Sequence, residues 1–183
     1  NDSAQEDFYV PRSIEVIALQ KRPREKKQRY FPELTDAKDI AIYYANKLCK
    51  NGGAAIFANR TSTVLTVINR LIEYRDRGHD LAEIKGNSDG EEMNRLAQLM
   101  SDYYGEQHPY TIACYLGVVP HYSNLPNGLR LAVEHACRNK ALRLIVCTST
   151  LAQGVNIPIK YLFMTSFMVA RNSMQIRSFQ NLM

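Results

Sequence analysis

The chain has 183 residues, of which 45% are hydrophobic, so it can form one domain with a substantial core. It contains no apolar run of about 18 residues, the length needed to span a bilayer, and we therefore expect no membrane partner. The net charge of +5 comes from residues 21–29, which hold six of the 23 basic residues and one of the 18 acidic residues. Because the two signs balance over the rest of the chain, net charge alone does not predict a nucleic-acid-binding face.

Cysteine spacing and the first residues of the chain indicate a cytoplasmic protein. The four cysteines, at positions 49, 114, 137 and 147, form no C-x-x-C pair, and the four histidines add no ligand spacing. We therefore expect reduced thiols and no metal site. The first seven residues are polar and acidic, whereas a signal peptide begins basic and then turns apolar. The chain lacks an initiator Met and ends in what reads as an interrupted helix, so we expect a piece of a longer protein.

Residues 1–34 are predicted to form an interdomain linker. It contains one strand, where the pattern alternates over residues 13–19, and the basic segment 21–29. Two interpretations of the basic segment are open: a contact with nucleic acid, or a solvated linker, which is the commoner role of a charge run. Residues 35–183 are predicted to form one α/β domain.

Helices and strands alternate through this domain. A helix is expected over 35–50, with Thr35 as its cap and a glycine pair after it. A buried strand over 53–58, a helix over 63–77, a polar loop over 84–90, a helix over 91–104 and a short helix before Gly117 follow. A strand over 117–122, a helix over 126–140, strands over 142–148 and 161–165, and a helix over 173–183 complete the pattern. This order, with continuous apolar strands, predicts a mostly parallel sheet with helices on both faces.

Small polar residues follow three of the predicted strands. These segments, residues 59–62, 120–126 and 148–158, are rich in hydroxyl, amide or glycine residues. Ligands of parallel α/β sheets bind beyond the carboxyl ends of the strands, so the three segments should open onto one edge. Taken alone, each is explained better by helix capping. Together they predict an anion-binding rim, because hydroxyl groups and helix N-termini bind phosphates.

The sequence TSTLAQGVNIP at residues 148–158 resembles motif V of superfamily 2 helicases of the DEAD/DEAH type. It is most similar to the processive branch that includes the RNA-exosome and DNA-repair helicases, whose motif reads roughly T-S-T-L-A-x-G-V-N-L-P. Residues 117–126 resemble the segment G-V-x-x-H-H-A-G-L-P of the same branch, with Tyr122, Ser123 and Asn124 in place of H-A-G. Residues 53–62 resemble motif IV, and residues 179–183 resemble the lead-in to motif VI.

The resemblance implies that residues 35–183 form a three-layer RecA-like domain, the second of two, cut before motif VI. It also implies partial sites for ATP and for DNA or RNA. The residues expected to contact nucleic acid are Asn59, Arg60, His121, Thr148 and Ser149, and those expected to face ATP are Gly154 and Asn156. Glycine permits close approach of the backbone to a ligand, and asparagine offers both a donor and an acceptor. A turn before Pro158 is the alternative role of Asn156.

Several parts of an ATPase site are missing from this sequence. It has no G-x-x-x-x-G-K-[ST] phosphate loop, no D-E-x-[HD] metal motif and no arginine finger. The resemblance assigns the first two to the first RecA-like domain of the same protein, where ATP and Mg²⁺ would bind. We therefore expect half of the ATP cleft and of the nucleic-acid track of an ATP-dependent helicase, which couples hydrolysis to translocation or unwinding.

By itself the chain holds no complete catalytic site, and we expect it to be inactive alone. The alternative is a RecA-like domain that binds nucleic acid or protein without catalysis. An unrelated α/β enzyme would need a glycine-rich phosphate loop of its own, and the sequence has none. The choice between DNA and RNA is open, because no local motif reports a 2′-hydroxyl contact.

Overall fold

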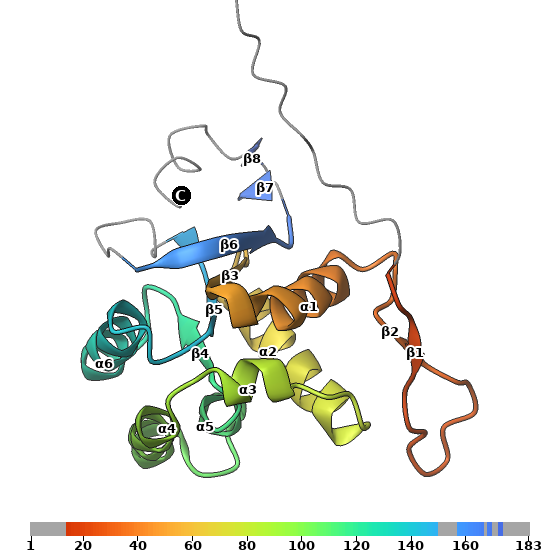
Figure 1. Ribbon diagram of the computed structural model, residues 1–183, viewed down its shortest axis with the longest axis horizontal. Helices are drawn as coiled ribbons and strands as arrows, with labels where there is room; N and C mark the ends of the chain where they lie inside the picture. The colour runs from red at the N-terminus through yellow and green to blue at the C-terminus, as the bar shows by residue number, and fades with distance from the viewer. Residues whose placement is uncertain (1–13, 150–156, 167, 170–171, 174–183) are drawn as a thin grey trace, which may run out of the picture.

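A four-stranded parallel sheet lies at the centre of the computed structural model, which describes residues 14–149, 157–166, 168–169 and 172–173 (Figure 1). The strand order is β4-β5-β3-β6, with β4 at Val118–His121, β5 at Leu144–Cys147, β3 at Gly53–Phe57 and β6 at Ile159–Met164. All three neighbouring pairs in this sheet are parallel. Two antiparallel pairs lie outside it: β1 (Ile17–Ala18) with β2 (Tyr30–Phe31), and β7 (Met168–Val169) with β8 (Asn172–Ser173).

Helices flank the parallel sheet. They are α1 (Ala37–Leu48) with the 3-10 turn η1 (Cys49–Asn51), α2 (Thr61–Asp76), α3 (Ala82–Gly86), α4 (Gly90–Tyr104), α5 (Pro109–Cys114) and α6 (Asn127–Arg138). α1 packs on β3 and β6, α2 on β4 and β5, and α6 on β4. The predicted α/β class is therefore confirmed, and the arrangement is consistent with a three-layer RecA-like fold.

The central strands form the middle of the core. Every residue of β4 and β5 is buried, as are all but the first of β3, whereas β6 is only partly buried. Continuous apolar sequence is what a strand covered on both faces requires. α2 turns Val64, Val67, Ile68 and Leu71 inward, at the three- and four-residue spacing of a helix face.

Several element boundaries differ from the sequence prediction, and two of the differences have a clear physical cause. α1 is capped by Asp36 instead of Thr35, because the Asp36 carboxylate accepts a hydrogen bond from the Lys38 backbone N–H at 2.9 Å. The polar segment 84–90 is not wholly a loop, since α3 extends to Gly86 around the fully buried side chain of Ile84. The helix predicted over 173–183 lies outside the described residues, apart from Ser173, which is in β8.

The N-terminal segment folds as a hairpin on the side of the domain. The strand predicted over 13–19 is reduced to the two residues of β1, which pair with β2 and not with the main sheet. Leu19 and Phe31 are buried in the same core as the helices, and the Phe31 ring lies 4.2 Å from that of Tyr74. Through Leu19 and Phe31, the predicted linker is thus anchored to the core of the domain in this structure.

A charged cluster joins the start of α1 to α2. Arg70 of α2 forms ion pairs with Asp39 and, at 2.7 Å, with Asp36. Asp39 is 1% exposed and also accepts a hydrogen bond from the Glu33 backbone N–H at 3.0 Å. A buried carboxylate needs such partners, so the cluster fixes the chain entering α1 against α2.

None of the helices in the described part of the chain is long and apolar enough to cross a membrane.

Candidate functional site

The four parallel strands end level with one another. His121 of β4 lies opposite Cys147 of β5, Cys147 opposite Phe57 of β3, and Phe57 opposite Met164 of β6. Backbone hydrogen bonds continue the ladder one residue further, from Thr148 N to His121 O at 3.0 Å and from Ala58 N to Cys147 O at 2.7 Å. The segments that follow β3, β4 and β5 therefore leave the sheet at one carboxyl edge, as the sequence predicts.

The start of α2 presents exposed polar groups at this edge. Arg60 adopts an extended conformation (φ −147°, ψ 153°) as the N-cap, and its side chain makes no capping hydrogen bond. Arg60, Thr61 and Ser62 are exposed, and the Thr63 hydroxyl donates to Asn59 Oδ1 at 3.3 Å. A helix of this length carries a partial positive charge at its first turn, where its free N–H groups point outward. The helix begins two residues earlier than predicted, which adds Thr61 and Ser62 to its first turn.

The other two segments at the edge are short in the described chain. Thr148 is half-buried and Ser149 is exposed directly after β5. After β4, Ser123 and Asn124 are exposed between the buried side chains of Tyr122 and Leu125. Residues 58–62, 122–126 and 148–149 contain one cation, Arg60, and no carboxylate. This composition suits an anion better than a cation.

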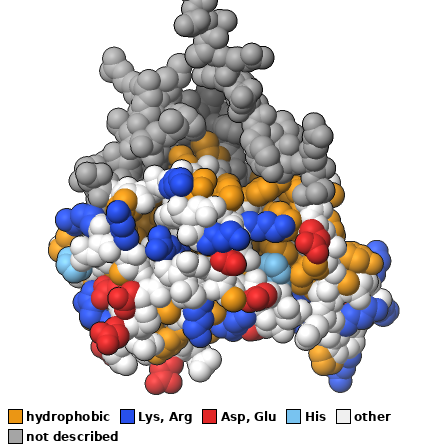
Figure 2. Space-filling view, in the orientation of Figure 1, with side chains coloured by type: hydrophobic (Ala, Val, Ile, Leu, Met, Phe, Trp, Pro, Cys, Tyr) orange, Lys and Arg blue, Asp and Glu red, His pale blue; other side chains and the backbone are white. Residues whose placement is uncertain are grey.

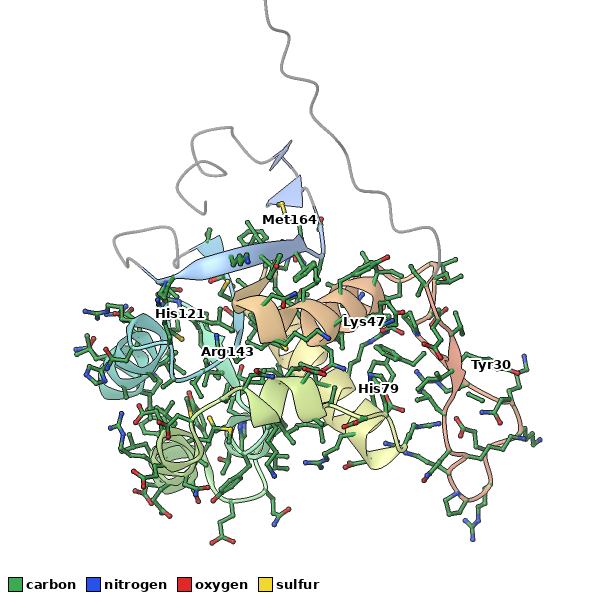
Figure 3. All side chains as sticks on the ribbon, viewed as in Figure 1. Tyr30, Lys47, His79, His121, Arg143 and Met164 are labelled. Carbon is green, nitrogen blue, oxygen red and sulfur yellow. The ribbon has the colours of Figure 1, made fainter. Side chains whose placement is uncertain are left out.

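His121 lies beneath this edge, beside α6 (Figure 3). Its side chain is 1% exposed, and its Nε2 lies 3.0 Å from Oε1 of Glu134 on α6. Glu134 also lies 3.8 Å from Arg138 and 4.0 Å from Arg130. The sequence analysis did not predict this His–Glu pair. The signal that could have revealed it is the position of His121 within a buried strand, because a buried histidine needs a polar partner. The predicted contact of His121 with nucleic acid stays a prediction, and the observed pair gives the residue a structural role.

Tyr122 explains how the chain departs from the H-A-G pattern. Its ring is buried, and its hydroxyl lies 3.4 Å from that of Tyr104 and its centroid 6.0 Å from that of Tyr110. Burial raises the pKa of Tyr122 to about 12. The side chain thus packs against α4 and α5 beneath the loop, so that Ser123 and Asn124 remain as its exposed polar groups.

The two residues predicted to face ATP, Gly154 and Asn156, lie outside the described residues. Within the described ranges no group of three His, Cys, Asp or Glu side chains could hold a metal ion, and this part of the chain therefore gives no support to a metal site. All four cysteines are buried free thiols. Burial raises the pKa of Cys49 to about 11 and those of Cys114 and Cys137 to about 12.

A cavity of about 310 Å³ lies at the opposite edge of the sheet, where β3, β5 and β6 begin. It is lined in part by Lys140, Arg143 and Lys160. The Arg143 guanidinium donates to the Asn87 carbonyl at 2.6 Å, and Lys160 donates to the Asn51 carbonyl at 3.3 Å. Two of its three cations therefore already bond to backbone carbonyls, and the cavity does not coincide with the predicted site.

The chain is a parallel α/β domain with an exposed polar carboxyl edge, and sequence comparison finds distant similarity to helicases. No family model matches the chain. It is 27% identical over 132 residues to the ATP-dependent DNA helicase Hel308 of Thermoplasma volcanium, covering 66% of this chain and 19% of the relative. It is 39% identical over 51 residues to Hel308 of Aeropyrum pernix, covering 28% of this chain and 7% of the relative.

The chain also aligns with the Hachiman protein HamB of Bacillus cereus. The identity is 27% over 184 aligned positions, which cover 98% of this chain and 16% of the relative. The chain thus spans less than a fifth of the length of each of these three relatives. The comparisons support a helicase-related domain.

Proposed function

We propose that the chain is the second RecA-like domain of an ATP-dependent superfamily 2 helicase of the processive DEAD/DEAH-type branch, in a protein that acts in the cytoplasm. It would supply half of the nucleic-acid track and half of an ATP cleft whose Mg²⁺-binding half belongs to the first RecA-like domain. The similarity to Hel308, named as a DNA helicase, favours DNA over RNA as the strand. The observation that carries the proposal is the level ending of four parallel strands beneath an exposed, carboxylate-free polar edge.

Asn59, Arg60, Thr148 and Ser149 belong to the strand-binding half of this site. Arg60 offers a guanidinium next to the free N–H groups of α2, and Ser149 offers an exposed hydroxyl on the neighbouring segment. Such groups hold a phosphate backbone without reading its sequence. Gly154 and Asn156 are assigned to the nucleotide by their positions in motif V alone. His121 would contribute indirectly, by holding the loop that follows β4 in position.

The strand-binding half is tested by the salt dependence of binding to a fluorescent oligothymidylate. Arg60→Ala should weaken binding and reduce the slope of log K against log salt by about 0.7, the value for one phosphate contact of a single strand. Arg75→Ala is the matched control, because Arg75 lies near the other end of the same helix and pairs with Asp76. Equal effects of the two substitutions on binding would show that the strand does not bind at the carboxyl edge.

Thr148→Ala provides the second arm of the test. It should weaken binding of the strand, whereas Thr66→Ala should not, because Thr66 is exposed on α2 and its hydroxyl donates to the Ser62 carbonyl at 2.9 Å. In the longer protein, Asn156→Ala should lower ATP turnover by about 5- to 150-fold, the equivalent of about 1–3 kcal/mol for one buried hydrogen bond. An Asn156→Ala protein with full turnover and a lower melting temperature would favour the turn role of Asn156.

A further inference from the structure

The basic segment forms the ordered tip of the β1–β2 hairpin. This basic hairpin, residues 17–31, makes the lobe at the lower right of Figure 2, where Lys and Arg side chains gather. The tip is held by backbone hydrogen bonds from Leu19 N to Arg29 O at 2.9 Å and from Glu25 N to Arg22 O at 3.1 Å. The Gln28 side chain donates to the Leu19 carbonyl at 2.6 Å. The cations of the segment are thus carried by a folded loop.

The one acidic residue of the tip is used inside the structure. Both carboxylate oxygens of Glu25 accept hydrogen bonds from Arg77 at 3.0 Å, which lowers the pKa of Glu25 to about 2. Glu73 of α2 lies 3.0 Å from the same Arg77 and 2.8 Å from Arg29. These ion pairs attach the hairpin to the end of α2, and their positive and negative charges neutralise one another.

The remaining cations of the tip face solvent. Lys21, Arg24, Lys26 and Lys27 are exposed, and none of them forms an ion pair within the described residues. The hairpin therefore presents four uncompensated positive charges over a few residues. A surface of this kind attracts a polyanion, and the attraction is sensitive to salt.

An exposed apolar groove adjoins this charged tip. It has a volume of about 430 Å³ and is lined by Val16, residues 28–30 and residues 32–34. Tyr30 is 54% exposed and lies at the outer side of the hairpin (Figure 3). Val16 and Leu34 are also exposed, and Arg29 and Glu33 supply one charge of each sign. Basic groups beside an exposed aromatic ring are the combination that binds single strands, since every base has a face that can stack.

We propose that the basic hairpin is a second nucleic-acid-binding surface, which takes a single strand with phosphates on Lys21, Arg24, Lys26 and Lys27 and a base on Tyr30. The class of ligand rests on the proposed function, but the surface is separate from the carboxyl edge of the sheet. A duplex fits less well, because its paired bases offer no free face to Tyr30. An acidic protein would satisfy the charges but gains nothing from stacking.

The test uses the purified 183-residue chain and a fluorescent oligothymidylate, with anisotropy recorded over a range of salt. The variant K21Q/R24Q/K26Q/K27Q should flatten the slope of log K against log salt by up to about 2.8, from about 0.7 for each of four phosphates. The control K50Q/R75Q/K85Q/R95Q removes the same charge elsewhere and should change the slope far less. Tyr30→Ala should weaken binding at least about fivefold, and Tyr30→Phe should retain it.

Four results would overturn the inference. They are equal slopes for the hairpin variant and its control, no effect of Tyr30→Ala, equal competition by duplex or by polyglutamate, and no binding at low salt. Circular dichroism melting checks that the variants fold, which is expected because the five side chains are exposed. The two proposals fail separately. If Arg60→Ala weakens binding and the hairpin variant does not, this inference fails alone; the reverse result removes the carboxyl edge and keeps the hairpin.

Discussion

Replacing Glu134 with alanine should destabilise the domain by about 1–3 kcal/mol, because it leaves the His121 ring buried without a partner. The Nε2 atom of His121 lies 3.0 Å from Glu134, and its Nδ1 atom has no hydrogen-bond partner among the described residues. The substitution therefore removes the one polar contact that the described residues make with a ring that is 1% exposed.

The two arginines that also approach Glu134 add little to this figure. Arg138 and Arg130 lie 3.8 and 4.0 Å from its carboxylate, and their side chains are 51% and 37% exposed. Exposed pairs of this kind contribute about 0–1 kcal/mol. Glu134→Gln keeps a hydrogen-bonding group in reach of His121, so it should cost much less than Glu134→Ala. For a domain of this size, 1–3 kcal/mol corresponds to a fall of roughly 2–12 °C in Tm.

The assay is chemical and thermal unfolding of the wild type, Glu134→Ala, Glu134→Gln, His121→Ala and the double variant Glu134→Ala/His121→Ala. Non-additive costs in this cycle would measure the coupling of the two side chains. A cost of Glu134→Ala within about 0.5 kcal/mol of zero, as for an ordinary surface change, would refute the reasoning. Weaker strand binding without destabilisation would instead favour a direct contact between His121 and nucleic acid.

Three further predictions follow from burial. Because burial raises the pKa of the thiols, the four cysteines of the native chain should not react with a thiol reagent at about pH 8, and should react on unfolding; a stoichiometric native reaction would contradict this. Burial lowers the pKa of His79 from 6.5, so the unfolded chain takes up the proton first and stability should fall as pH drops below that value. His79→Phe should flatten the pH dependence of the free energy of unfolding. An unchanged pH dependence in this variant would show that His79 is not its source. Arg70→Met should cost about 2–3 kcal/mol in chemical unfolding, less than a fully buried pair because Arg70 is 23% exposed. Asp39→Asn in the same chain should restore part of this loss, and no recovery would show that the cost does not come from the buried, unpaired charge of Asp39.

The sequence was most informative where local pattern and burial coincide. Continuous apolar runs predicted β3, β4 and β5, and the period of Val64, Val67, Ile68 and Leu71 predicted α2. The β1–β2 hairpin was not predicted as a pair, because two-residue strands carry almost no periodic signal. Its position depends on contacts far along the chain, such as Phe31 with Tyr74.

The same distinction holds for the candidate site. The alternation of strands and helices was enough to predict that residues 59–62 and 148–149 lie at one edge, since parallel strands end together. The partner of His121 could not be read from its motif, because that partner, Glu134, lies on the following helix. The assignments of Gly154 and Asn156 rest on the motif V resemblance, and these two positions lie outside the described residues.

The carboxyl edge is tested most directly by photo-cross-linking of an oligonucleotide that carries a photoreactive thymine analogue, with the attached peptides identified by mass spectrometry. We predict cross-links within residues 58–62 and 148–149, lost on competition with unlabelled single strand and reduced in Arg60→Ala. Cross-links confined to the amino edge of the sheet, around Lys140 and Lys160, would contradict this prediction.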